Sequence, residues 1–217
     1  MNMKLSFSIL FSLCSLLFMG QSNMHFSNSI ALDILNGDYD PNNYKQSIPI
    51  SNPGSITQGI NASVSPDSLH SYLSVLDNFY TRNTASDTLS ATTGIGAARS
   101  WIHEKFKDFS LANENRLVTT YFVFDQNVCN VGRHKNVLTI LPGQDTSNHE
   151  IVIIEGHFDS RCETSCDTAC QAEGMEDNGS GTALVMELAR VMSGYSFNKT
   201  IVFMTTTGEE QGLIGAN

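Results

Sequence analysis

Three short segments in the second half of the chain carry residue types that bind divalent metal ions. The segments read EGHFDS (155–160), GMEDNGSG (174–181) and TTTGEEQGL (205–213). Their metal-binding candidates are one imidazole and several carboxylates, namely His157, Asp159, Asp177, Glu209 and Glu210. Neutral imidazole and carboxylate oxygen are the donors that Zn2+ commonly takes in proteins. The three segments together therefore predict a zinc site.

The spacing of these residues suggests separate tasks. Asp159 follows His157 by two residues, and a carboxylate on the far ring nitrogen is the usual way to hold a ligating histidine in one tautomer. Glu209 and Glu210 are adjacent, so one carboxylate can bind metal while the other moves protons. Taken singly, His157 could be a hydrogen-bonded loop residue, Asp177 a helix cap and the glutamates a solvated pair. Their occurrence together favours one site.

Other catalytic motifs fit less well. The GSG at 179–181 resembles the middle of a serine hydrolase elbow, but the flanking residues are Asn178 and Thr182 rather than glycine. The sequence has neither a Walker phosphate loop nor a His-Glu-x-x-His helix. Three cysteines spaced four residues apart, from Cys162 to Cys170, could form a thiolate metal site. Disulfides are the better interpretation, because the basic start and apolar run of residues 1–20 predict export.

The apolar pattern around these segments predicts the elements that position them. Helical spacing of apolar residues occurs at 66–80, 97–106 and 182–192, and strand-like runs occur at 117–124, 136–141, 151–154 and 200–204. The run IVII at 151–154 is apolar at every position, which predicts a strand buried on both faces. Strand 151–154, helix 182–192 and strand 200–204 then form a right-handed parallel crossover.

This order of elements predicts an α/β fold. We expect a three-layer α/β/α sandwich with a mostly parallel central sheet that is incomplete at the C-terminus. Ligands of such sheets bind beyond the carboxyl ends of the strands. Segments 155–160 and 205–213 directly follow two strands, and segment 174–181 precedes the crossover helix. All three should therefore meet at one edge of the sheet.

The same segments carry a family resemblance. GHFDS (156–160), EDNGSGTALVMELAR (176–190) and TIVFMTTTGEEQGLIGA (200–216) resemble, in order and spacing, the motifs of secreted dizinc aminopeptidases of the bacterial leucyl aminopeptidase type. That superfamily also includes glutaminyl cyclases and carboxypeptidase-like relatives. FYTRN (79–83), GIGAARSWI (94–102) and KNVLTILPG (135–143) are weaker matches in the expected order. The resemblance extends from about Ser68 to Asn217.

The resemblance implies a role for each candidate residue. His157 would bind one zinc, Asp177 would bridge two zincs, and Glu210 would bind the second. Glu209 would be the general base and acid for water that two zincs activate, and Asp159 would orient His157. The peptide bond after Asp177 is a candidate for the cis form. The implied reaction is hydrolysis of N-terminal residues from peptides or proteins.

Two alternatives to this function stay open at the level of sequence. The protein could be a glutaminyl cyclase-like enzyme, or a non-catalytic relative that uses the fold for binding. The family uses five zinc-binding side chains, and this sequence supplies three; an Asp and a His are expected downstream of Glu210. We therefore expect residues 66–217 to be the N-terminal part of a zinc peptidase domain that is inactive by itself.

The first 65 residues differ in composition from the rest. A short basic start, an apolar run from Leu5 to Met19 and the small residue Gly20 predict a signal peptide at residues 1–20. The protein is then secreted or periplasmic, with no stable membrane span after cleavage. Residues 21–65 are rich in Asn and Ser and are interrupted by prolines, which predicts a poorly ordered leader or linker.

Charge and cysteine content add two constraints. The 217 residues carry a net charge of −10, so nucleic acid, which is bound through clustered Lys and Arg, is not an expected partner. Four cysteines follow the predicted signal peptide, at positions 129, 162, 166 and 170. An even number in an exported chain predicts two disulfides, and three pairings are possible.

Overall fold

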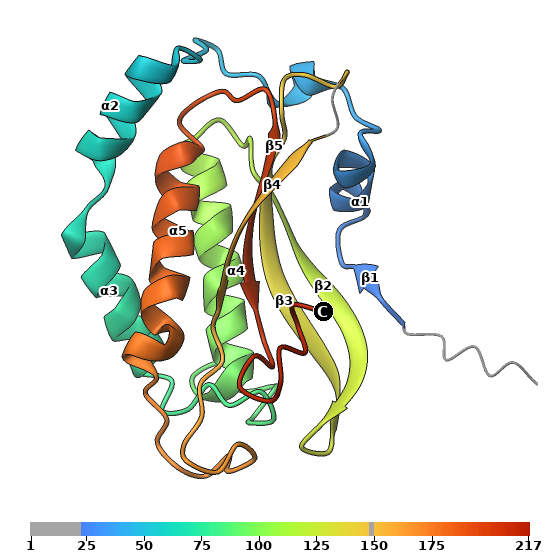
Figure 1. Cartoon of the computed structure of the whole chain (residues 1–217), viewed down its shortest axis with the longest axis vertical. Coiled ribbons are helices and arrows are strands. Elements are labelled where there is room, and N and C mark those ends of the chain that lie inside the picture. The colour runs from blue at the N-terminus through green and yellow to red at the C-terminus, as the bar shows by residue number, and fades with distance from the viewer. Residues whose placement is uncertain (1–22, 148–149) are drawn as a thin grey trace, which may run out of the picture.

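The computed structural model describes residues 23–147 and 150–217, which contain a twisted sheet with helices on both faces (Figure 1). The sheet has five strands in the order β1-β2-β3-β5-β4. They are β1 (His25–Phe26), β2 (Val118–Val128), β3 (Val131–Leu141), β4 (Ile151–His157) and β5 (Thr200–Thr206). The predicted signal peptide at residues 1–20 lies outside the described residues.

The predicted α/β class is confirmed, but the predicted mostly parallel sheet is wrong. Among the described strands, β1–β2, β2–β3 and β3–β5 pair antiparallel, and β4–β5 is the parallel pair. For the β2–β3 pair, the reason lies in the turn that connects the two strands. Only Cys129 and Asn130 separate these strands, with φ of 47° and 71°. A two-residue turn of left-handed residues makes a hairpin and leaves no room for a crossover helix.

The predicted crossover is present and sets up the functional end of the sheet. Strand β4, helix α5 (Gly181–Met192) and strand β5 follow each other in the chain, and the two strands pair in parallel with His157 opposite Thr206. Their carboxyl ends therefore stop at the same level. Strand β5 is almost wholly buried, as its apolar sequence predicts.

Strand β4 does not have the burial that its sequence predicts. It lies at the edge of the described sheet, and Ile151, Val152 and Ile153 are 38%, 43% and 59% exposed. These neighbouring side chains point to opposite faces. An apolar run indicates that a strand favours burial. The position of that strand in the sheet depends on which strands pair with it.

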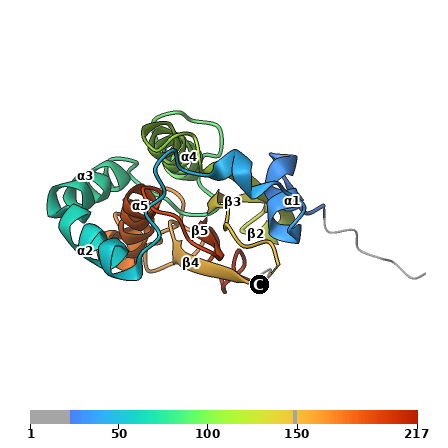
Figure 2. The same ribbon diagram turned by 90° about the horizontal axis from the view of Figure 1, so that it is seen from above.

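Helices cover one face of the sheet more completely than the other (Figure 2). The helices are α1 (Ser29–Asn36), η1 (Pro41–Tyr44), α2 (Pro53–Ser63), α3 (Pro66–Asp77), α4 (Gly94–Ala112), η2 (Met175–Ser180) and α5. The main core lies between α3, α4, α5 and the sheet, and includes Phe106, Met186 and Phe203. Helix α3 begins as predicted, with the Ser65 hydroxyl accepting a hydrogen bond from the Ser68 amide at 3.2 Å.

The predicted leader or linker is folded over its described part, which contradicts the poor order expected from its composition. Ala31 and Ile34 of α1 are buried against the opposite face of the sheet, where they join a second apolar cluster with Ile140 and Val202. Strand β1 also pairs with β2. The Asn and Ser residues that suggested an irregular chain serve partly as helix caps, such as Asn28 of α1.

The four cysteines form two disulfides, as predicted. Cys129 pairs with Cys166 and Cys162 with Cys170. The first bond ties the β2–β3 turn to the loop between β4 and η2. The second closes a small ring within that loop. Within the described ranges, no helix combines the length and the hydrophobicity needed to cross a membrane.

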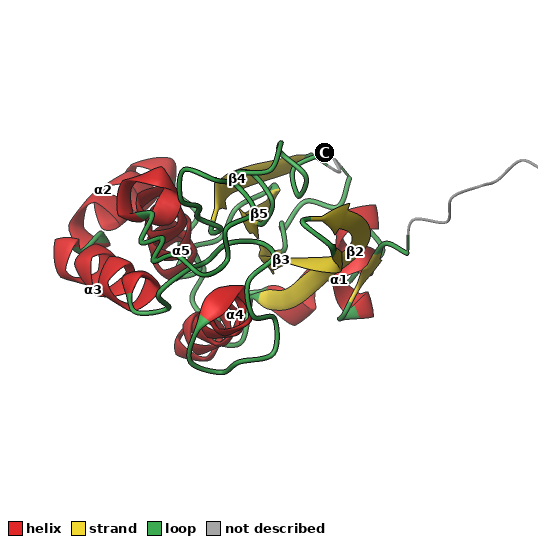
Figure 3. Cartoon of the chain, turned by 90° about the horizontal axis from the view of Figure 1, so that it is seen from below, coloured by secondary structure: helices red, strands yellow, loops and turns green. Residues whose placement is uncertain are grey.

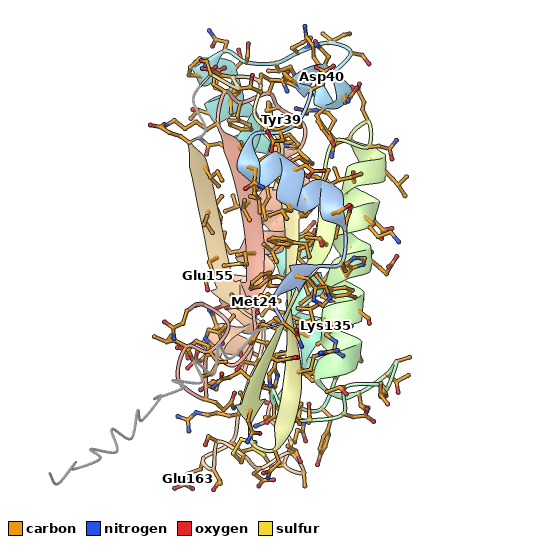
Figure 4. All side chains as sticks on the ribbon, turned by 90° about the vertical axis from the view of Figure 1, so that its right-hand side faces the viewer. Met24, Tyr39, Asp40, Lys135, Glu155 and Glu163 are labelled. Atoms are coloured by element: carbon orange, nitrogen blue, oxygen red, sulfur yellow. A yellow bond between two sulfur atoms is a disulfide. The ribbon has the colours of Figure 1, made fainter. Side chains whose placement is uncertain are left out.

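The two ends of the molecule differ in what they carry. Tyr39 and Asp40 lie at one end of the long axis, and Glu163 of the disulfide-bonded loop lies at the other (Figure 4). Polar loops gather at the Glu163 end, which Figure 3 shows from below. The predicted metal site belongs to this end.

Candidate metal centre

His157 is the last residue of β4, and its ring lies among carboxylates. Its Nε2 atom is 3.1 Å from Oδ1 of Asp177 and 3.7 Å from Oε2 of Glu209. On the other side of the ring, Nδ1 is 3.2 Å from the Asp159 carbonyl oxygen and 3.5 Å from Oδ1 of its carboxylate. The structure thus brings the three predicted segments together around one imidazole.

His157, Asp177 and Glu210 form a group of potential metal ligands. Each offers one atom, and these three atoms lie within 4.8 Å of one another. Bonds of about 2.0–2.2 Å from one zinc ion to each ligand require ligand atoms no more than about 4.4 Å apart. Small side-chain adjustments would therefore let the three close on one ion, and one imidazole with two carboxylates is a suitable donor set for zinc.

Asp159 is fully buried and links the segments. Its carboxylate accepts hydrogen bonds from the Thr84 hydroxyl at 3.1 Å and from the backbone amides of Glu209 and Glu210 at 3.3 and 3.2 Å. One side chain therefore contacts the His157 ring and both residues of the glutamate pair. That Asp159 orients a metal-binding His157 stays a prediction.

Electrostatics around His157 favour its cationic form. Burial of the ring opposes a positive charge, but the neighbouring Asp159 and Glu209 carboxylates outweigh that effect and raise the pKa of His157 to about 9. Burial also raises the pKa of Glu210; its ion pair with Arg161 opposes this rise, while the charge of Asp177 adds to it. A site in which carboxylates outnumber cations attracts a positive ion.

Glu209 is placed differently from its neighbour. It lies outside the group of three ligand candidates, and its side chain is about one-third exposed. Glu210 is more enclosed, at 10% exposure. The adjacent glutamates thus place one carboxylate in the ligand group and the other beside it; their separate roles stay a prediction.

Asp177 lies in the distorted helical turn η2, before α5. Backbone angles at Asp177 and Asn178 are not helical, and the bond between these residues is cis, as the resemblance implies. The Asn178 side chain accepts a hydrogen bond from the Gly181 amide at 2.9 Å. The Asp177 side chain is 77% exposed, so one face of the candidate site is open to solvent.

Three supporting residues were not predicted from the sequence. Arg82 and Thr84 lie in the chain between α3 and α4 and contact the segments that carry His157, Asp159 and Asp177. Arg161 donates from Nε to Oε2 of Glu210 at 2.7 Å, across 49 positions. The weak FYTRN match at 79–83 was the one available signal for Arg82. No local pattern pointed to Arg161 or Thr84.

A cavity of about 420 Å3 opens beside the ligand group. It is lined by Arg161, Cys162, Glu163, Gly174, Met175, Glu176, Asp177 and Glu210. Two of the three ligand candidates therefore face a space that can admit a small group. The disulfide-bonded loop and η2 form the walls of this space.

Comparison with known proteins places the site in a family. Residues 136–217 match Peptidase family M28, and all five predicted site residues lie in that range. A protein named a probable zinc metalloprotease from Phaeosphaeria nodorum is 31% identical over 182 residues; the match covers 76% of this chain and 36% of that protein. The chain therefore spans about a third of the length of this relative.

Solved structures share the fold at lower identity. The LapA aminopeptidase of Legionella pneumophila is similar with a TM-score of 0.60 at 20% identity, over 79% of this chain and 42% of that one. LapB of the same organism gives a TM-score of 0.61 at 19% identity, over 87% of this chain and 45% of that one. These two structures show the fold alone; the family is indicated by residues 136–217, whose sequence matches Peptidase family M28.

Proposed function

We propose that this protein is a zinc-dependent aminopeptidase that hydrolyses residues from the N-termini of peptides or proteins. The observation that carries the proposal is the group formed by His157, Asp177 and Glu210, with Glu209 beside it. Membership of a peptidase family and a relative named a probable zinc metalloprotease support the reaction class and the metal.

His157, Asp177 and Glu210 would hold the metal. We propose two zinc ions per complete site, with Asp177 shared between them, because its exposed carboxylate has two oxygens that can serve different ions. When bound, zinc supplies a Lewis acid that polarises a peptide carbonyl and lowers the pKa of water. Residues 1–217 alone contain three of the five ligands that the family resemblance implies, so we expect this polypeptide by itself to bind zinc weakly and to be inactive.

Glu209 is the candidate general base and acid. Its carboxylate is beside the ligand group and is partly exposed, so it can accept a proton from water and return it to the departing amine. Asp159 holds the backbone amides of both glutamates and the His157 ring. It therefore keeps base and ligands in fixed relative positions.

The predicted signal peptide at residues 1–20 supports export, to the outside of the cell or to the periplasm. The two disulfides fit an oxidising compartment. Peptides and proteins with free N-termini would be the substrates. No nucleic-acid partner is proposed, because the chain is acidic.

The decisive experiment compares the full-length protein with its Glu209→Gln variant. Zinc content is measured by elemental analysis, and turnover is measured on leucyl peptides with free and with acetylated N-termini. We expect the variant to keep its zinc and to lose at least about 100-fold in turnover. The acetylated peptide should not be cleaved by either protein.

Four results would contradict the proposal. Normal cleavage by Glu209→Gln would remove Glu209 from the chemistry. Equal cleavage of acetylated and free peptides would indicate an endopeptidase. Cyclisation of N-terminal glutamine without peptide cleavage would identify a glutaminyl cyclase. The absence of any reaction from a zinc-loaded protein would indicate a non-catalytic relative.

A further inference from the structure

Arg82 is a buried guanidinium that no part of the proposed reaction uses. Its side chain lies before α4 and is 1% exposed. It donates hydrogen bonds to four backbone carbonyls: Nε to Phe158 (2.7 Å), Nη1 to Leu76 (3.0 Å) and Glu173 (2.7 Å), and Nη2 to Gly174 (2.9 Å). Four of its five N–H donors are thus engaged by four residues from three separate segments.

Three of these carbonyls, those of Phe158, Glu173 and Gly174, belong to the segments that lead to the metal ligands His157 and Asp177. Phe158 lies between His157 and Asp159, so a bond to its carbonyl fixes the backbone between a candidate ligand and the carboxylate that orients it. Gly174 begins the turn that carries Asp177, and its carbonyl also accepts from the Gly179 amide at 2.8 Å. Arg82 therefore joins the His157 segment to the Asp177 segment through the backbone.

The backbone of Arg82 reinforces the same connection. Its amide donates to the Ser160 hydroxyl at 3.1 Å, and its carbonyl accepts from the Ser160 amide at 3.2 Å. The Ser160 hydroxyl in turn donates to the carbonyl of Ala172 at 2.7 Å. Both the side chain and the main chain of Arg82 thus hold residues 158–160 against residues 172–174.

The packing at Gly174 leaves no room for a side chain beside this guanidinium. Gly174 has φ of +49°, and a Cβ atom added there would lie 2.5 Å from Cβ of Ser160 and 3.1 Å from Nη2 of Arg82. Glycine is required by the close approach as well as by the backbone angle. A longer side chain would separate Arg82 from the turn that leads to Asp177.

We propose that Arg82 is a positioning residue for the metal centre: it holds the segment of His157 and Asp159 in register with the segment of Asp177. The planar guanidinium suits this role because it directs several donors at once, whereas a lysine ammonium keeps the charge but concentrates its donors on one atom. The proposal rests on the proposed zinc-binding function and names a residue that supports it.

The structure offers a matched control in Arg116. This guanidinium is also 1% exposed and also bonds to backbone carbonyls, those of Tyr44 and Ser193, both at 2.7 Å. Neither partner belongs to the segments of the metal centre. Arg116→Lys should therefore show how much stability is lost when a buried arginine is replaced, without a change at the metal centre.

The test measures zinc affinity in the full-length protein by chelator competition, and unfolding by urea, for wild type, Arg82→Lys and Arg116→Lys. We expect both variants to be less stable, and only Arg82→Lys to bind zinc at least about 10-fold more weakly under conditions where it is folded. Equal zinc affinity of wild type and folded Arg82→Lys would overturn the proposal. An equal loss in Arg116→Lys would overturn it too.

A second measurement separates failure of this inference from failure of the proposed function. Hydrogen exchange of the metal-free proteins is followed by mass spectrometry in peptides covering residues 158–160 and 174–181. Faster exchange in both peptides for Arg82→Lys, but not for Arg116→Lys, supports the positioning role. This holds even if the wild-type protein binds no zinc. Lack of zinc binding by the wild type would refute the metal site but not the positioning role. Unchanged exchange in Arg82→Lys would overturn the positioning role. If Arg82→Lys does not fold, Arg82→Gln is measured in the same way, and the same results support or overturn the proposal.

Discussion

The Nε2 atom of His157 lies 3.1 Å from Oδ1 of Asp177, although twenty positions separate the two residues. The pairing arises because β4 ends at His157 and the chain returns through a disulfide-bonded loop to the start of the crossover helix. A ring nitrogen and a carboxylate oxygen held so close can share a metal ion. This contact is the geometric centre of the proposed site.

Asp177→Asn tests that contact directly. The change keeps the shape of the side chain but removes its charge, so we expect zinc affinity to fall by more than the roughly 10–100-fold that loss of a ligand's hydrogen-bond partner costs. Chelator competition measures the affinity. Glu176→Gln, at an exposed neighbouring acid, is the matched control and should bind zinc as wild type does. Similar losses in both variants would indicate a general effect of negative charge.

Glu187 provides a prediction on stability. Its fully buried carboxylate accepts from the Ser65 amide at 2.7 Å and pairs with Arg190, so it joins α5 to the start of α3. Glu187→Gln should lower the free energy of unfolding at pH 7 by about 1–3 kcal/mol, because a charged hydrogen-bond acceptor is lost. Urea unfolding measures this, and exposed Glu104→Gln is the control.

The effect of Glu187 should also depend on pH in a defined direction. Burial alone would raise the pKa of Glu187, but the bonds from Arg190 and the Ser65 amide outweigh it and lower this pKa below its usual value of 4.5. The carboxylate then stabilises the fold above pH 4.5, and that contribution is lost as the pH falls through the lowered pKa. The stability difference between wild type and Glu187→Gln should therefore shrink in acid. A constant difference from pH 7 to pH 3 would contradict this interpretation.

The two disulfides should contribute unequally to stability. Cys129–Cys166 spans 37 positions and Cys162–Cys170 spans 8. If disulfides act mainly by restricting the unfolded chain, the bond that closes the longer loop should raise the free energy of unfolding by about 1 kcal/mol more than the other. Urea unfolding of the two paired Cys→Ser variants measures the difference. A larger loss from the shorter loop would show that Cys162–Cys170 stabilises the native loop itself.

Local patterns in the sequence were enough to predict much of this protein. Residues at helical spacing mark α3, α4 and α5, and apolar runs mark β2 to β5, because burial of one face imposes a period on the chain. His157, Asp159, Asp177, Glu209 and Glu210 could be named because polar segments follow strands that end at one edge of a sheet. The number of disulfides also followed from composition.

Other features depended on contacts between distant segments. The edge position of β4 follows from its pairing with β5. Residues 23–65 are folded because the apolar side chains of α1 pack against the sheet. Arg82 reaches Phe158 across 76 positions and Gly174 across 92. No periodicity within either segment encodes such a contact.

The residues of the candidate metal site could be predicted from the sequence, because ligand types and strand-end positions are local properties. The direction of the strands, the pairing of the four cysteines and the contacts of Arg82 and Arg161 became visible in the folded chain alone. The physical reason is that hydrogen bonds and ion pairs depend on distance in space, and folding brings together carbonyls, guanidinium groups and thiols that the chain holds far apart.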